Sequence, residues 1–184
     1  LLKEVPLTSK VRFASFTNEE PPFFITEQMG SRVYAREIRG RGEKIKAAVI
    51  LEMIGYYSDK AFSQKYLLLL GPFYPNRADF IAFVGNFPTH RITEKFYRAF
   101  RAHSDFPVAK ITSPDFIPGI NFSDHWSFWK EGLPALMVTD TAFLRNPHYH
   151  QETATARTLD YAKMSKMLYG LRRSIVEYLR AERP

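Results

Sequence analysis

Residues 47–55 read Ala-Ala-Val-Ile-Leu-Glu-Met-Ile-Gly, an apolar run that a single charged residue, Glu52, interrupts. Short apolar runs with β-branched residues are typical of strands that a sheet buries on both faces. A carboxylate in such a strand is unfavourable unless a cation neutralises it. We therefore predict a strand over Ala47 to Met53, in which a charge is expensive if it is buried. We expect Glu52 either to form a salt bridge with a nearby arginine or to bind a metal ion.

The segments on both sides of this run alternate between strand-like and helix-like patterns. Further strands are predicted over Val11 to Phe16, Asp79 to Val84, Pro107 to Thr112 and Ala135 to Thr139. Helices are predicted over Gly30 to Arg39, Thr93 to Ala102, Trp126 to Glu131 and Leu159 to Glu182, with Thr93 as a favourable N-cap. The alternation indicates an α/β fold, in which helices cover both faces of a sheet.

The composition is that of a globular protein. With 184 residues, of which 45% are hydrophobic, the chain has the size of one domain, and we predict a single domain over residues 1–184. No cysteine is present, which excludes disulfides and thiolate zinc sites and leaves His, Asp and Glu as metal ligands. No apolar run approaches the roughly 20 residues of a membrane-spanning helix. The compartment stays open.

The first residues, Leu1-Leu2-Lys3-Glu4-Val5, have the pattern of the last turn of a helix. Since the first part of such a helix would lie upstream of Leu1, we expect this sequence to be a piece of a longer protein.

The formal net charge is +7. One stretch is rich in basic residues, namely Arg32, Arg36, Arg39, Arg41, Lys44 and Lys46. A basic patch is the electrostatic signature of nucleic-acid binding, but no nucleic-acid motif accompanies it, and Glu37 and Glu43 interrupt it. We interpret the stretch as a solvated surface and expect neither a nucleic-acid nor a membrane partner.

Residues that suit catalysis or metal binding occur at or just beyond the ends of predicted strands. They are Glu19-Glu20, Glu52, Ser123-Asp124-His125 and Tyr149-His150. An α/β sheet gathers the carboxyl ends of its strands at one edge, so we expect these residues to converge there. Two adjacent carboxylates such as Glu19 and Glu20 repel each other unless a cation or proton offsets the charge, although a solvated acidic turn is the simpler interpretation.

Several of these residues also allow other interpretations. Ser123 or Asp124 is suited to cap a helix that begins at Trp126, and Asp124 is equally suited to orient a ligand. A Ser/His/Asp triad is allowed by composition, but the sequence has no Gly-x-Ser-x-Gly elbow. Imidazole is the commonest metal ligand, which favours His150, whereas His148 is expected merely to be exposed.

Five blocks of sequence stand together in the order and spacing of one known family. They are Asn18-Glu19-Glu20, Leu51-Glu52-Met53-Ile54-Gly55, Ser123-Asp124-His125, Gly132-Leu133-Pro134-Ala135 and Tyr149-His150. With these blocks the chain resembles the co-catalytic zinc aminopeptidases of the aminopeptidase Y type, whose fold is shared with glutaminyl cyclases. The resemblance covers nearly the whole chain. It implies a mostly parallel, mixed sheet flanked by helices, the three-layer sandwich of the zinc aminopeptidases.

The resemblance also implies catalytic roles. Glu19 resembles the general base that takes a proton from zinc-activated water. Tyr149 resembles the residue whose hydroxyl stabilises the oxyanion. Asp124 resembles a residue that orients the metal ligands without binding the metal itself.

The same resemblance implies metal ligands. Glu20 and His150 resemble ligands of one zinc ion, and Glu52 resembles a ligand of the other, at a position where the family often has Asp. A complete site in the family holds two zinc ions, and two neighbouring ions polarise a carbonyl group and activate water.

The chain departs from the family in two places. The remaining family ligands, a His and a bridging Asp, come from a segment upstream of the Glu-Glu pair, and the 18 residues before Glu19 contain neither. Ala154 stands where the family usually has Asp. We therefore expect a domain truncated at its N-terminus that lacks the N-terminal strands, binds zinc weakly or not at all, and is inactive by itself. We expect it to self-associate through the sheet surface left uncovered.

The function implied by the resemblance is that of a zinc-dependent aminopeptidase acting on peptide substrates. A glutaminyl-cyclase-like acyltransferase is an alternative, although Tyr149 stands where cyclases typically have Trp. A non-catalytic, peptidase-like scaffold is another, favoured by Ala154. Aromatic loop residues are expected to line a substrate pocket, namely Phe73, Tyr74, Phe116 and Phe143.

Overall fold

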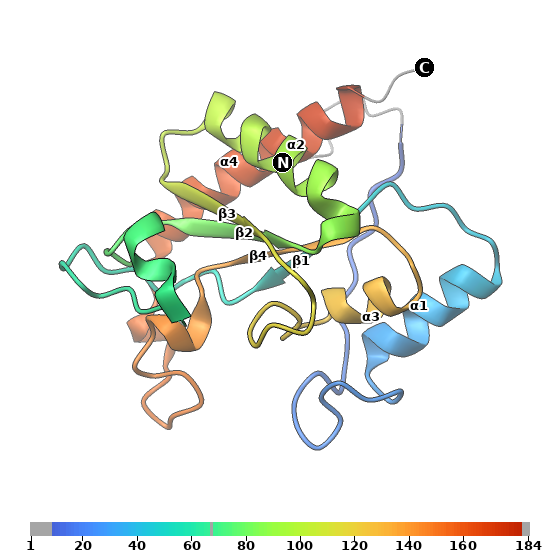
Figure 1. Cartoon of the computed structure of the whole chain (residues 1–184), viewed down its shortest axis with the longest axis horizontal. Coiled ribbons are helices and arrows are strands. Elements are labelled where there is room, and N and C mark those ends of the chain that lie inside the picture. The colour runs from blue at the N-terminus through green and yellow to red at the C-terminus, as the bar shows by residue number, and fades with distance from the viewer. Residues whose placement is uncertain (1–8, 67, 182–184) are drawn as a thin grey trace.

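The computed structural model describes residues 9–66 and 68–181 (Figure 1). The strands are β1 (Ala48–Glu52), β2 (Ile81–Gly85), β3 (Val108–Thr112) and β4 (Ala135–Thr139). The α-helices are α1 (Gly30–Gly40), α2 (His90–His103), α3 (His125–Lys130) and α4 (Tyr161–Ala181). Short 3-10 helices cover Leu68–Phe73, Phe87–Thr89, Ala142–Leu144 and Ala156–Thr158. The helical turn expected at Leu1 to Val5 lies outside the described residues.

The strands form one mixed sheet in the order β1-β4-β2-β3. β1 runs parallel to β4, and β2 runs parallel to β3, whereas β2 and β4 are antiparallel. Helices α2 and α4 cover one face of the sheet, and α1 and α3 lie against the other (Figure 1). The predicted α/β fold, with a mixed sheet flanked by helices, is confirmed.

The core between the sheet and α2/α4 is mainly aromatic and aliphatic. Ile81 and Phe83 of β2 pack there with Phe96 and Phe100 of α2. Helix α4 approaches α2 closely at Gly170, where an added Cβ would lie 2.7 Å from the Phe100 ring. A glycine is therefore required at this crossing, because any side chain would push the two helices apart.

The core on the opposite face uses the other side of the same strands. Ala35 and Ile38 of α1 pack with Phe128 of α3 and Ala135 of β4. Because side chains alternate along a strand, β4 contributes to both cores through successive residues, and all its residues are buried. This burial on both faces explains why β2 and β4 appear in the sequence as continuous apolar runs.

The strand predicted over Val11 to Phe16 is wrong, since these residues are irregular in the structure. Phe16 instead packs its ring against Tyr34 at 5.3 Å and Phe128 at 6.2 Å, while Phe13 is 82% exposed. Strand propensity alone does not form a strand, because the backbone also needs a neighbouring strand to complete its hydrogen bonds.

Helix α2 begins at His90, three residues before the predicted N-cap Thr93, which lies inside the helix. The 3-10 helix Phe87–Thr89 leads directly into α2, and Asn86 caps this 3-10 helix, since its side chain accepts a hydrogen bond from the N–H of Thr89 at 3.1 Å in a capping box. The hydroxyl of Thr93 donates to the carbonyl of Thr89 instead of capping. The predicted N-cap at Thr93 is therefore wrong, and the capping side chain in this region is that of Asn86.

The basic stretch from Arg32 to Lys46 is not simply a solvated surface. Arg32 is 8% exposed and forms ion pairs with Glu27 and Glu131. Arg41 pairs with Glu37 at 2.9 Å. Nearby glutamates therefore neutralise part of this basic stretch.

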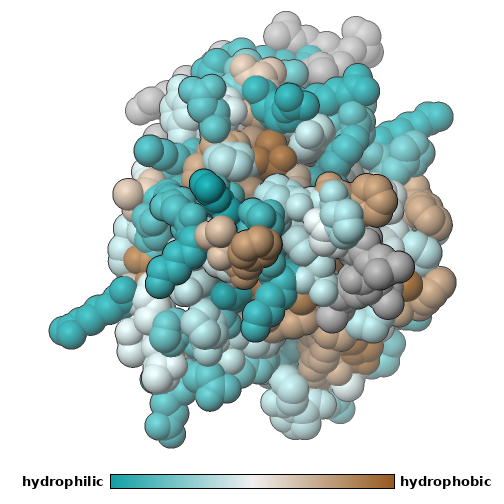
Figure 2. Space-filling model, turned by 60° about the vertical axis from the view of Figure 1, so that its left-hand side comes forward, coloured by the Kyte–Doolittle hydropathy of each residue, from teal (hydrophilic) through white to brown (hydrophobic). Residues whose placement is uncertain are grey.

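None of the helices in the described parts of the chain combines the length and hydropathy needed to cross a lipid bilayer. The face in Figure 2 is mostly hydrophilic, and its apolar side chains form patches separated by polar ones.

Candidate active site

The direction of the strands decides which of them contribute to the site. Because β1 and β4 are parallel, their carboxyl ends lie at the same edge of the sheet. Since β2 is antiparallel to β4, β2 and β3 end at the opposite edge. The expectation that all strand ends gather at one edge is therefore wrong for half of the sheet. Glu52 is the last residue of β1 and lies at the edge shared with β4.

The other candidate residues reach this edge through loops. Glu19 and Glu20 lie in the loop before α1, and the backbone N–H of Gly30 at the start of that helix donates to the carbonyl of Thr17 at 2.9 Å. An added Cβ on Gly30 would lie 2.9 Å from the backbone N of Thr17. The glycine thus lets the loop with both glutamates pack tightly against the helix.

Four separate segments bring their side chains together at this edge. The Oε1 atom of Glu20 lies 3.5 Å from Nε2 of His150. The Oγ of Ser123 donates a 2.7 Å hydrogen bond to Oε2 of Glu52. The ring of Tyr149 is stacked on that of His150, with centroids 4.0 Å apart. The structure thus brings together the loop before α1, the end of β1, the start of α3 and the loop after β4.

The carboxylates of this group repel one another. Burial, reinforced by the charges of Glu52, Glu20 and Asp124, raises the pKa of Glu19 to about 7. Burial also raises the pKa of Glu52, and the charges of Asp124 and Glu20 add to this effect, while the hydrogen bond from Ser123 opposes it. Burial likewise raises the pKa of Asp124. The group holds excess negative charge that a cation would relieve.

Neither structural alternative for these residues is seen. Among the described residues, Glu52 forms no ion pair with an arginine, and its side chain is bonded to Ser123. Asp124 occupies the N-cap position of α3, but its side chain makes no capping hydrogen bond. One of its oxygens, Oδ1, is buried without a hydrogen-bond partner. Such an orphaned oxygen is expensive unless a further group approaches it.

The residues of a Ser/His/Asp triad are not assembled. His125 is fully buried, and its Nε2 lies 2.7 Å from the carbonyl of Ile120. Burial lowers the pKa of His125 to about 4, so the imidazole is neutral at pH 7. The hydroxyl of Ser123 donates to Glu52 and not to His125. Since the ring of His125 is bonded to a backbone carbonyl in the core, we assign this histidine a structural role.

The donors at this edge suit zinc in type, because zinc accepts carboxylate oxygen and imidazole nitrogen. The repelling carboxylates and the orphaned oxygen of Asp124 also fit a cation. Within residues 9–66 and 68–181, however, no group of three or more His, Asp or Glu side chains is close enough to hold a metal ion. The described residues fit zinc in chemistry and charge, and the set that they form is partial.

Two residues near the site were not predicted from the sequence. Asp140 follows β4 and is fully buried, and Arg145 lies in the same loop and is also buried. The aromatic residues that were predicted to line a substrate pocket differ in their distance from the site and in their exposure. Phe143 lies 6.0 Å from the ring of Tyr149, whereas Phe73 and Phe116 are exposed.

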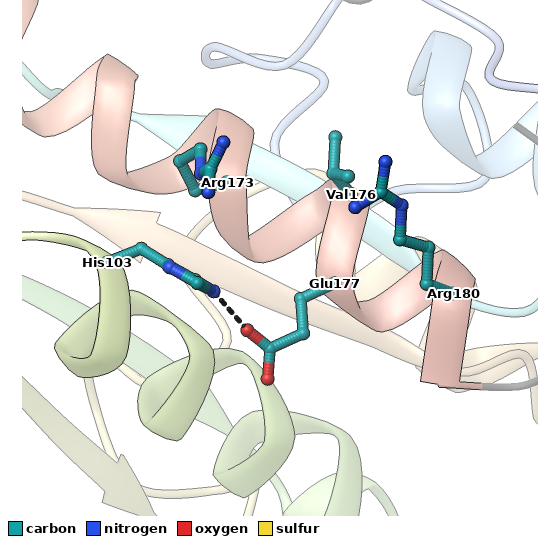
Figure 3. A pocket seen from close by; sticks show the side chains of 5 residues that line it. All are labelled: His103, Arg173, Val176, Glu177 and Arg180. Carbon is teal, nitrogen blue, oxygen red and sulfur yellow. Dashed lines mark hydrogen bonds and ion pairs between the residues drawn. The ribbon is translucent and has the colours of Figure 1, made fainter. Parts of the chain in front are cut away.

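The two cavities found along α2 and α4 are separate from the site. One, of about 320 Å³, lies between these helices and is lined by His103, Arg173, Val176, Glu177 and Arg180 (Figure 3). The Nε2 of His103 and a carboxylate oxygen of Glu177 lie 2.5 Å apart across it. The neighbouring cavity, of about 760 Å³, also includes none of the predicted site residues.

Comparison with solved structures defines the class of fold. The zinc aminopeptidase BSAP of Bacillus subtilis matches 96% of this chain with a TM-score of 0.67 and 16% sequence identity, over 37% of its own length. The LapA aminopeptidase of Legionella pneumophila matches 84% of the chain with a TM-score of 0.60 and 19% identity, over 37% of its own length. The chain thus has the α/β fold of these aminopeptidases.

The sequence identifies the family. A sequence model of Peptidase family M28 matches residues 1–174, and the chain belongs to this family. The uncharacterized protein YfbL of Escherichia coli (strain K12) is 40% identical over 172 residues, which are 93% of this chain and 52% of YfbL. The chain therefore spans about half the length of this relative.

Proposed function

We propose that this chain carries part of the active site of a zinc-dependent aminopeptidase that removes N-terminal residues from peptides. The observation that carries the proposal is the contact between Glu20 and His150 beside the carboxylates of Glu19 and Glu52. These donors come from segments far apart in the sequence, and they meet with an excess of negative charge. Membership of a peptidase family and the fold of aminopeptidases support the proposal.

Glu20 and His150 would hold one zinc ion and Glu52 the other. Zinc bound here supplies positive charge that polarises a peptide carbonyl and makes water more acidic. Catalytic zinc normally has three protein ligands, and the described residues offer fewer for each ion. We therefore expect the chain by itself to bind zinc weakly and to be inactive.

Glu19 is the proposed general base. Its carboxylate, half-buried beside other acids, has a pKa of about 7, so it accepts a proton readily near neutral pH. Glu19 would take a proton from the attacking water and deliver it to the leaving amine. A group whose pKa lies close to the working pH is suited to both transfers.

Tyr149 is the proposed oxyanion donor. Burial raises the pKa of its hydroxyl, and the charges of Glu52, Glu20 and Glu19 add to this effect. The phenol therefore keeps its proton at neutral pH and can donate a hydrogen bond to the developing oxyanion, an interaction worth about 3 kcal/mol in comparable sites. Asp124, behind the ligands, is proposed to orient them.

Metal titration of the purified chain tests the ligand assignment. We expect weak Zn²⁺ binding by calorimetry that Glu20→Gln and His150→Ala each weaken further. Glu152→Gln, which removes an exposed carboxylate from the same loop as His150, serves as the matched control and should leave binding unchanged. Tight binding of two zinc ions per chain, or equal effects of Glu20→Gln and Glu152→Gln, would contradict the assignment.

The role of Glu19 can be tested in a protein that contains this sequence and has zinc-dependent aminopeptidase activity. Glu19→Gln should lower kcat by about 10²–10⁴-fold, because a general base contributes rate in that range. Zinc affinity should stay the same, since Glu19 is not a proposed ligand. A variant with full kcat would exclude Glu19 as the base.

A non-catalytic scaffold is the second candidate, and two observations favour it. Ala154 offers no carboxylate to support His150, and the described residues hold no group of three metal-binding side chains. A protein that contains this chain and binds peptides without cleaving them, with or without zinc, would support the scaffold. A glutaminyl-cyclase-like activity is disfavoured by Tyr149.

We also propose that the chain self-associates through β1. This strand is an outer strand of the described sheet, and its Leu51 is exposed. Exposed edge strands with apolar side chains tend to pair with other chains. Sedimentation should show oligomers that Leu51→Lys reduces, and a monodisperse monomer would exclude this association.

A further inference from the structure

One buried carboxylate has no part in the proposed chemistry. Asp140 follows β4 directly and is 0% exposed. Its Oδ2 accepts hydrogen bonds from the backbone N–H groups of Gly55, at 3.0 Å, and Tyr56, at 2.8 Å. The N–H of Asp140 donates in turn to the carbonyl of Met53 at 2.6 Å. These bonds hold the segment that starts directly after Glu52.

The other carboxylate oxygen of Asp140 holds a second loop. Its Oδ1 accepts a 2.9 Å hydrogen bond from the N–H of Ala142. From there a chain of backbone bonds continues, because the N–H of Asn146 donates to the carbonyl of Ala142 at 2.9 Å, and that of Tyr149 to the carbonyl of Asn146 at 3.2 Å. This second loop therefore leads by successive turns to Tyr149 and His150.

The turns next to Asp140 adopt a backbone conformation that needs support. Met53, Thr141 and Ala142 have positive φ angles of 46°, 73° and 44°. Residues other than glycine keep this left-handed conformation where the surrounding structure holds them in it. A carboxylate suits the task, because its two oxygens accept several N–H groups, whereas an amide has a single acceptor oxygen.

We infer that Asp140 is a positioning residue, which fixes Glu52 relative to Tyr149 and His150 through hydrogen bonds to both loops. The inference deepens the proposed function and rests on it for the use of these side chains, while the hydrogen bonds themselves are independent of it. Arg145 anchors the second loop to the sheet, because its Nη1 donates to the carbonyl of Phe80 at 2.8 Å. Asp140 thus connects two loops of which one is already fixed.

Amide hydrogen exchange of the wild-type chain is the first test. The N–H groups of Gly55, Tyr56 and Ala142 should exchange at least about 100-fold more slowly than those of exposed loops, since each is bonded to a buried carboxylate. In Asp140→Asn they should exchange at least about tenfold faster, while Val84 in the central strand β2 keeps its protection. A uniform loss of protection would mean that Asp140 merely stabilises the fold.

The second test separates positioning from stability. The control is Asn86→Ala, which removes a buried capping box beyond β2, at the opposite edge of the sheet. Both variants should lower the Tm, but Asp140→Asn alone should shift the NMR signals of Glu20, Glu52 and His150. Asp140→Asn should also weaken Zn²⁺ binding about tenfold, an effect that Asn86→Ala should not share.

The outcomes are distinct. Rapid exchange of Gly55, Tyr56 and Ala142 in the wild type, or unchanged signals of Glu52 and His150 in Asp140→Asn, would overturn the inference whether or not zinc binds. If the wild type binds no zinc while the exchange and NMR results hold, the ligand assignment fails and the positioning by Asp140 stands. If Asp140→Asn does not fold, exchange in the wild type decides.

Discussion

Two regions of this chain bury polar side chains but differ in how their charges are compensated. One is the group of carboxylates at the strand ends, and the other is the layer formed by α1 and α3. The carboxylates of the first region are Glu19, Glu20, Glu52 and Asp124. In the layer, Arg32 lies between Glu27 and Glu131, so each buried charge has an opposite partner. His125 is kept neutral in the same layer and is bonded to a backbone carbonyl. The charges there are matched, as stability requires, although Nδ1 of the neutral His125 has no hydrogen-bond partner within the described residues.

At the strand ends the charges are unmatched. Burial raises the pKa values of Glu19 and Glu52, and the charges of the surrounding carboxylates add to this effect. Asp124, at the start of α3, joins the two regions, and one of its oxygens has no partner. Groups that repel one another in the folded state lower stability, and proteins keep such arrangements chiefly where function needs them.

The largest effect predicted for this comparison concerns pH and His125. Because burial lowers its pKa from 6.5 to about 4, the unfolded chain binds the proton more strongly, so the stabilising contribution is full above pH 6.5 and is lost as the pH falls toward 4. The loss amounts to about 3 kcal/mol.

The carboxylates with raised pKa values have the opposite effect on the stability of the chain, because they make the folded state less stable as the pH rises. A variant is therefore needed to isolate the contribution of His125. His125→Gln should be less stable than the wild type at pH 7, and the gap should close as the pH approaches 4.5. Urea unfolding at a series of pH values measures this gap. A gap that is independent of pH would show that His125 is not held neutral.

The matched charges of the layer are tested by Arg32→Met. This change leaves Glu131 half-buried without its cation and should cost about 2–3 kcal/mol of unfolding free energy. The double variant Arg32→Met/Glu131→Met removes both charges and should recover most of that loss. If the single and double variants are equally destabilised, packing around Arg32 matters more than its charge.

The unmatched charges are tested by Glu52→Gln, with the opposite expected sign. The glutamine oxygen can still accept the hydrogen bond of Ser123, and one negative charge is removed from the group. The metal-free chain should therefore gain about 1 kcal/mol of stability above pH 7, while its zinc affinity falls. A loss of stability would mean that the carboxylates are better compensated than their contacts indicate.

The smallest effect is expected for an exposed ion pair at the C-terminal end of α1. Arg41 and Glu37 form an ion pair at 2.9 Å with both side chains exposed. Arg41→Ala should change the free energy of unfolding by less than about 0.5 kcal/mol, because solvent and salt screen such pairs. A cost close to that of Arg32→Met would remove the distinction between buried and surface charge in this layer.

The sequence predicted much of the fold because the strands of the sheet are short apolar runs. It also singled out Glu52, since a charge in such a run is unusual. It failed at Val11 to Phe16, where the described part of the chain offers no neighbouring strand with which these residues could pair. The antiparallel joint between β2 and β4 was not predicted either, because strand direction depends on contacts between distant segments.

The candidate site was less accessible to sequence reasoning. Glu20 and His150 were paired through a family resemblance, and no local pattern links two residues so far apart. Asp140 was missed because an Asp after a strand is typical of any loop. Its importance depends on meeting the N–H groups of Gly55 and Tyr56, 85 and 84 residues away.

The antiparallel pairing of β2 with β4 also has a practical consequence. Phe87 lies just beyond β2, at the edge remote from Glu52, and it is 60% exposed. Since the chain contains no cysteine, Phe87→Cys would create a unique thiol for attaching a fluorophore or a spin label. Such a probe would report on tumbling and assembly without disturbing the carboxylates at the far side.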